Sequence, residues 1–160
     1  MTQVLEPILA VCRRHADRLR WAMQQLSVSV PFDAQRLSGL SDMGLAVLDQ
    51  FTGRFARLLD VMGQSLFPAV LDRAHEPGDL SAFLDKLARL EKIGVIASAD
   101  EWIRLRELRN AFAQDYPDDP AVQAAILNRA IEAARSLLAI LDGVVAWLER
   151  QGGLPTAVSP

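Results

Sequence analysis

The residue types that most often build metal and catalytic sites are scarce in this chain. It has a single cysteine, Cys12, two histidines and one tyrosine. A lone cysteine cannot form an internal disulfide, which fits a reducing compartment. No cluster of cysteines and histidines has the spacing of metal ligands. We therefore expect no metal site and no cofactor.

Long apolar runs, targeting signals and phosphate loops are absent as well. No stretch approaches the roughly 18 apolar residues of a membrane-spanning helix, and residues 1–7 lack the basic-then-apolar order of a signal peptide. We expect a cytoplasmic protein without membrane association. The chain also lacks a glycine-rich phosphate loop, and the Gly-Ser with spaced aspartates of a nucleotidyltransferase. It is therefore not expected to be a nucleotidyltransferase itself.

Lysine is almost missing, because only Lys86 and Lys92 among the 17 basic residues are not arginine. The net charge is −3, whereas a general nucleic-acid binder usually has a basic surface. Any phosphate site must therefore be local.

What the chain does contain is helical periodicity. Its 160 residues, 51 % hydrophobic and 23 % charged, suit one globular domain. No segment alternates with the period of a β-strand. We predict an all-α fold, an antiparallel bundle of about five helices over residues 1–153, with a disordered tail at 154–160. The helices are expected at Val4–Leu26, from Ser41 to a kink or end at Pro68, at Asp79–Ile93, from Ser98, and from Asp119 to Gly152.

The apolar faces predict how these helices pack. The first helix is expected to turn inward Val4, Ile8, Val11, Leu19, Ala22 and Leu26. The stripes within 48–66 and 126–148 offer more apolar face than a thin bundle needs, which predicts a homodimer. His15 is expected at a helix or subunit contact rather than in catalysis, His75 at the surface, and Cys12 in the core.

One stretch, residues 104–117, combines an apolar stripe with polar side chains. Leu105, Leu108 and Phe112 should face inward, with Arg106 and Arg109 along one edge of that stripe. Asn110 and Gln114 share another face, four residues apart. An arginine beside a core stripe needs a partner, so this pattern suggests a specific polar site. The alternative is a solvated helix edge with weak surface pairs.

The same stretch resembles the motif of the HEPN family of helical proteins. That motif has an arginine, usually followed by a polar residue such as asparagine, and then a histidine a few residues on. In the toxin branch, four residues often separate the arginine from the histidine, and one residue separates the histidine from a tyrosine. This chain has Arg109, Asn110 and Tyr116 in that frame, but Gln114 in place of the histidine. The motif lies near the end of one helix and before another, as it does in that family.

The resemblance implies a homodimer that acts on RNA and pairs with a small nucleotidyltransferase in a bacterial toxin–antitoxin module. Carried over, Arg109 is the phosphate contact, with Asn110 in support, and Tyr116 is the candidate modification site. Arg109 and Gln114 are the catalytic candidates, and the ligand-binding candidates also include Arg106. Glutamine can form hydrogen bonds but cannot take a proton at neutral pH, so acid–base cleavage should be lost.

Three functions remain open. The first is a HEPN-like partner of a nucleotidyltransferase that binds RNA or nucleotide without efficient cleavage. The second is an active, metal-independent ribonuclease toxin, which the missing histidine disfavours. The third is a non-catalytic helical adaptor, which the preserved frame of Arg109, Asn110 and Tyr116 disfavours.

Overall fold

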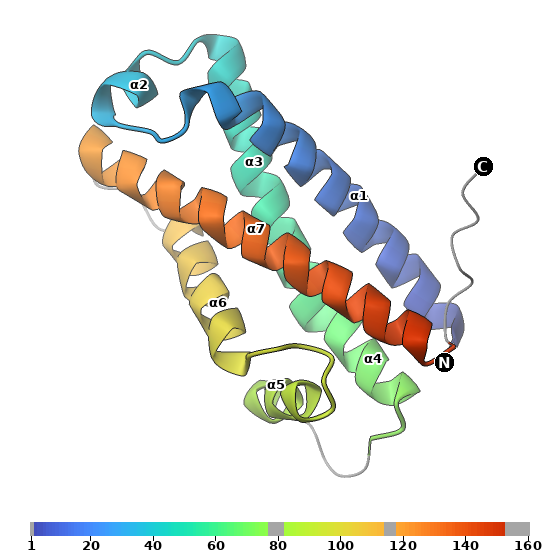
Figure 1. Cartoon of the computed structure of the whole chain (residues 1–160). Helices are drawn as coiled ribbons and strands as arrows, with labels where there is room; N and C mark the ends of the chain where they lie inside the picture. Colours follow the sequence, from blue (N-terminus) through green and yellow to red (C-terminus); the bar gives the residue numbers. More distant parts are fainter. Residues whose placement is uncertain (1, 77–81, 114–117, 153–160) are drawn as a thin grey trace, which may run out of the picture.

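Every regular element of the described chain is helical (Figure 1). The computed structural model describes residues 2–76, 82–113 and 118–152, with side chains described for 5–76, 82–112 and 118–152. The elements are α1 (Thr2–Leu26), the 3-10 turn η1 (Ser27–Ser29), α2 (Ala34–Ser38), α3 (Asp42–Val61), the π-helical segment η2 (Met62–Leu66), α4 (Phe67–Arg73), α5 (Phe83–Lys92), α6 (Ala99–Ala113) and α7 (Pro120–Arg150). The predicted all-α fold is confirmed.

The long helices form an antiparallel bundle. Helices α1, α3 and α7 run side by side along the molecule, and α1 packs against α3 over much of its length (Figure 1). Helix α6 lies against α3 and α7, and α5 closes the end opposite the short α2. No helix in the described ranges is both long and apolar enough to cross a membrane.

Helix ends follow the capping signals in the sequence. The side chains of Ser98 and Asp119 accept hydrogen bonds from the backbone of the helices that they precede, at 3.1 and 2.9 Å. At the end of α5, Gly94 adopts a φ of +82°. The following Val95 N–H donates to the Leu90 carbonyl at 2.9 Å, which completes a Schellman turn.

Two features of the helices differ from the simplest form of the prediction. The short α2 was not foreseen. At Pro68, where a kink or an end was predicted, the helix does not end but continues as α4 to Arg73, after the regular α-helical pattern is interrupted by η2. The Phe67 N–H bonds to the Met62 carbonyl, five residues back rather than four. This wide turn relaxes the regular ladder just before Pro68, so the proline with its missing N–H is accommodated.

The inward face of α1 is also shifted from the predicted one. Ile8 and Val11 are only half-buried, whereas Leu9 and Cys12 are fully buried. Both sets are apolar and spaced three or four apart, so periodicity alone cannot choose between them. Of the rest, Leu19, Ala22 and Leu26 are buried as predicted, and the side chain of Val4 lies outside the described residues.

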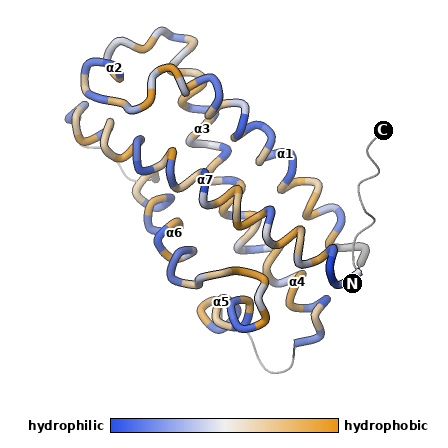
Figure 2. The backbone as a smooth tube through the Cα atoms, in the orientation of Figure 1, coloured by the Kyte–Doolittle hydropathy of each residue, from blue (hydrophilic) through white to orange (hydrophobic). Residues whose placement is uncertain are grey.

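The core lies between the helices and is wholly apolar among the described residues. Hydrophobic residues recur turn by turn along the helices (Figure 2). Trp102 of α6 has no exposed surface and packs on Phe67 with ring centroids 4.6 Å apart. Phe51, Phe55, Leu137 and Val144, from the stripes that motivated the homodimer, are buried within the single chain. These stripes therefore no longer support a homodimer, which stays a prediction.

Candidate functional site

A polar cleft of about 630 Å³ opens between α3, η2, α4, α5 and α6. It is lined by Leu59, Asp60, Gly63, Gln64, Pro68, Phe83, Lys86, Trp102, Arg106, Arg109 and Asn110. Three of the predicted ligand-binding residues, Arg106, Arg109 and Asn110, therefore meet in one concavity. They do so because α6 buries Leu105 and Leu108 and turns its other side toward α3 and α5.

Arg109 forms a bidentate ion pair with Asp60 of α3. Its Nε donates to Oδ1 at 3.1 Å and its Nη2 donates to Oδ2 at 2.9 Å. The hydrogen bonds from Arg109 to Asp60 raise the pKa of the guanidinium above its usual value, against the effect of burial. Both side chains keep part of their surface exposed, at 29 % for Arg109 and 38 % for Asp60. The pair is therefore rigid in geometry and still within reach of solvent.

Arg106 and Lys86 add positive charge to the same cleft. The Arg106 guanidinium carbon lies 4.6 Å from the centroid of the Phe83 ring, a cation–π contact that orients the side chain. Three cations, Lys86, Arg106 and Arg109, thus line the cleft, with Asp60 as the acidic residue in its lining. The balance of charge favours an anionic ligand.

The remaining residues of the predicted site lie outside the described residues. These are Gln114 and Tyr116, so the structure tests neither the catalytic candidate nor the modification site. Ligand binding by Arg106, Arg109 and Asn110 also stays a prediction, although the fold brings these three together.

Sequence reasoning missed Asp60, the partner of Arg109. A signal was present, because Asp60 is the one acidic residue between Asp49 and Asp72 and it falls within an apolar run. A carboxylate at such a position needs a cation close by. The sequence did not reveal which cation, since Arg109 is 49 residues away.

The histidines and the cysteine lie outside the cleft. His75 is exposed at the end of α4 and Cys12 is buried in the core, as predicted, where burial raises the pKa of its thiol to about 12. His15 Nδ1 lies 2.9 Å from Arg54 Nη1. A guanidinium can only donate, so Nδ1 is the acceptor and the proton of the neutral imidazole is on Nε2. Burial, and then the charges of Arg54, Arg57 and Arg14, lower the pKa of His15.

No protein-family model matches this chain, and neither a curated protein nor a solved structure matches it. The HEPN resemblance of the motif at 109–116 therefore stays a prediction from the sequence.

Proposed function

We propose that the protein is a HEPN-like component of a bacterial toxin–antitoxin module, a partner of a small nucleotidyltransferase that binds RNA or nucleotide without efficient cleavage. The observation that carries the proposal is the cleft in which Arg109, Arg106 and Lys86 surround an open volume of about 630 Å³. The cations of the cleft suit the charge of a phosphate group, and the volume leaves room for the rest of a nucleotide.

The pair with Asp60 prepares Arg109 for this role. A guanidinium has five N–H donors, and Asp60 accepts from Nε and from Nη2. Three N–H groups stay available to a ligand. Because Asp60 fixes the plane of the guanidinium, little side-chain entropy is lost when an anion binds.

Inefficient cleavage follows from the chemistry of Gln114. The HEPN motif supplies an ionisable imidazole at that position, whereas a glutamine amide cannot act as a general acid or base at neutral pH. Among the described residues that line the cleft there is no histidine to replace it.

The test is binding of adenosine monophosphate by titration calorimetry, with Arg109→Ala as the variant. The variant should lose most of the affinity while keeping its helical circular dichroism. Arg104→Ala is the matched control, because Arg104 is exposed on α6 but lies outside this cleft. Unchanged binding by Arg109→Ala would remove the cleft from the proposal and leave the helical adaptor.

Ribonuclease assays separate binding from cleavage. The natural protein should cut RNA poorly, and Gln114→His should raise the rate, since acid–base catalysis contributes about a hundred- to ten-thousand-fold. Robust metal-independent cleavage by the natural sequence, lost in Arg109→Ala, would instead identify an active toxin.

The partner and the oligomeric state need separate measurements. We expect a nucleotidyltransferase encoded beside this chain to copurify with it, and light scattering to give a homodimer. A monomer at micromolar concentration would contradict the second expectation without affecting the first.

A further inference from the structure

A second cationic surface lies on the outer side of α1 and α3. We call it the α1–α3 arginine face and define it by Arg14, Arg18, Arg54, Arg57 and His15. Arg14 and Arg18 are four residues apart and so share a face of α1. Helix α1 packs against α3, and Arg54 Nη1 of α3 lies 2.9 Å from His15 Nδ1 of α1. The charges of Arg54, Arg57 and Arg14 contribute to the lowered pKa of His15, in keeping with this arrangement.

The arginines of this face lack acidic partners among the described residues. None of them forms an ion pair there. The neighbouring carboxylates are engaged elsewhere, with Asp17 on Arg20 and Asp60 on Arg109. The Nε of Arg54 is buried without a hydrogen-bond partner. Like charges gathered without compensation repel one another, so this face is stabilised by binding an anion.

The form of the face suits a strand rather than a small anion. Arg54, Arg57 and Asp60 follow one another at intervals of three on α3, so Arg57 lies between Arg54 and Asp60, and Asp60 lines the cleft. On α1, Trp21 follows Arg18 by three residues and is 44 % exposed. Cations in series beside an exposed indole ring are what single-stranded nucleic acid requires, with phosphates on the arginines and a base stacked on the ring.

We infer that the α1–α3 arginine face binds the phosphodiester backbone of a single-stranded nucleic acid that continues into the Arg109 cleft. The inference rests on the proposed function for the ligand in the cleft and adds that this ligand is a strand. A second copy of the chain fits this face less well, because a two-fold contact through it would bring arginine against arginine.

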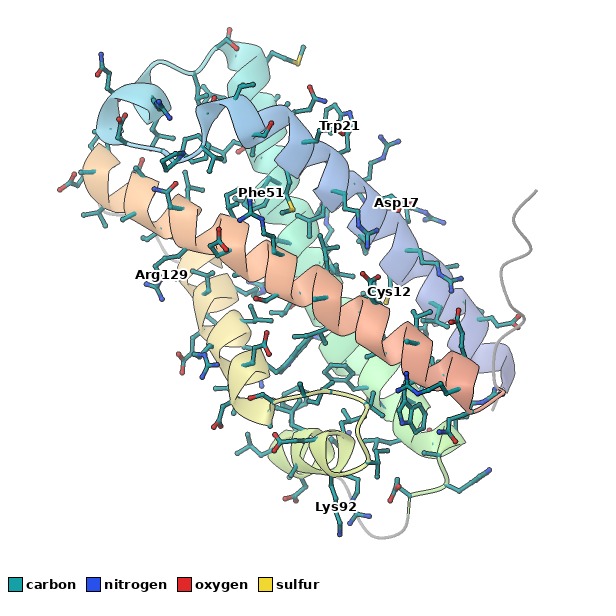
Figure 3. All side chains as sticks on the ribbon, viewed as in Figure 1. Cys12, Asp17, Trp21, Phe51, Lys92 and Arg129 are labelled. Carbon is teal, nitrogen blue, oxygen red and sulfur yellow. The ribbon has the colours of Figure 1, made fainter. Side chains whose placement is uncertain are left out.

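The experiment measures fluorescence anisotropy of labelled single-stranded RNA and DNA of about 12 nucleotides, a length within the usual range of such sites. The variant Arg14→Glu/Arg18→Glu changes two exposed side chains and should fold normally. Its control is Arg104→Glu/Arg129→Glu, with the same change in charge on two exposed residues of α6 and α7. Figure 3 shows Arg129 on the opposite side of the view from Trp21 and Asp17.

The expected result is weaker binding of both oligonucleotides by the first variant only. Two lost phosphate contacts should lower the salt slope by about 1.4, so the natural protein should lose about sevenfold more affinity than the variant between roughly 50 and 200 mM salt. Trp21→Ala should weaken binding about fivefold or more, and Trp21→Phe should restore most of it.

Binding of adenosine monophosphate distinguishes this inference from the proposed function. The variant Arg14→Glu/Arg18→Glu should bind the mononucleotide normally, whereas Arg109→Ala should not. If Arg109→Ala binds it normally, the proposed function fails. The inference is overturned if Arg14→Glu/Arg18→Glu binds oligonucleotides like the natural protein, whether or not it still binds a nucleotidyltransferase partner. It is also overturned if the control Arg104→Glu/Arg129→Glu weakens oligonucleotide binding equally.

Discussion

Replacing Asp60 by asparagine should strengthen anion binding in the cleft while weakening the fold slightly. Asp60 orients Arg109, but its carboxylate also repels any anion that approaches the same guanidinium. Asparagine keeps one oxygen, which can accept one of the two hydrogen bonds that Arg109 now makes at 3.1 and 2.9 Å, and it removes the charge. Its NH2 group only donates and cannot accept the second bond. One of the two contacts that orient Arg109 is thus retained, and the charge repulsion is lost.

The size of the effect follows from the geometry. An anion on the free side of Arg109 would lie about 6 Å from the Asp60 carboxylate, where two unit charges repel by about 1.4 kcal/mol at an effective dielectric constant of about 40. Asp60 is 38 % exposed. Physiological salt therefore screens the repulsion to about half, or about 0.7 kcal/mol. Binding should tighten by about threefold.

Titration calorimetry with adenosine monophosphate measures the gain, and thermal unfolding measures the loss. The lost ion pair should lower stability by about 0.5–1 kcal/mol, or about 2 °C in Tm for a chain of this size. Asp142→Asn is the control, since it removes an exposed carboxylate that pairs with Arg20 at 3.4 Å, away from the cleft. Weaker or unchanged binding by a folded Asp60→Asn variant, or an equal gain in the control, would refute the reasoning.

Three further predictions concern stability and reactivity. The Asn128 side chain accepts from the Phe32 N–H at 2.7 Å and donates to the Phe32 carbonyl at 2.8 Å. Asn128→Ala should therefore lower the free energy of unfolding, measured in urea, by about 1–3 kcal/mol, and a loss below the error of the measurement would contradict this role. Cys12 is buried and its pKa is raised to about 12, so it should react with a thiol reagent at pH 8 only after urea unfolds the chain. Fast labelling of the native protein would refute this. The pKa of His15 is lowered from 6.5 in the folded state, so the unfolded state takes up a proton first and stability should fall as the pH falls below 6.5. His15→Gln should reduce that fall, and an unaltered pH profile would exclude His15 as its source.

Local chemistry in the sequence predicted the helix ends but not the contacts between helices. Ser98, Gly94 and Asp119 act within a few residues of themselves, so their roles were readable from the chain. The buried face of α1 could not be predicted in this way. Two apolar faces of similar quality compete, and only packing against α3 and α7 decides which of them is buried.

In the candidate site too, features local to one helix were predicted from the sequence and contacts between helices were not. The helical spacing of 106–110 predicted that Arg106 and Arg109 lie beside the inward stripe of α6. Their partners Phe83 and Asp60 come from other helices, and no local pattern pairs them. The contact of His15 with Arg54 is likewise 39 residues apart in the chain. Such contacts depend on how α3 is rotated against its neighbours, and periodicity leaves that rotation open.

The π-helical segment η2 bears on how this chain tolerates changes in length. Because the Phe67 N–H reaches back five residues to Met62, the turn holds one residue more than a regular α-helix would. Deleting one residue from 62–66 would therefore return the backbone to the regular α-helical repeat without rotating α4 relative to α3, so Phe67 and Val70 would stay on their buried face. Deleting one residue from the regular part of α3 would instead rotate the helix beyond the deletion by about 100° and take these side chains out of the core. The first deletion should keep cooperative unfolding, with some loss of stability because Pro68 would then lie in a regular helix, and the second should abolish it. Related chains of different length should place a single-residue gap at this turn.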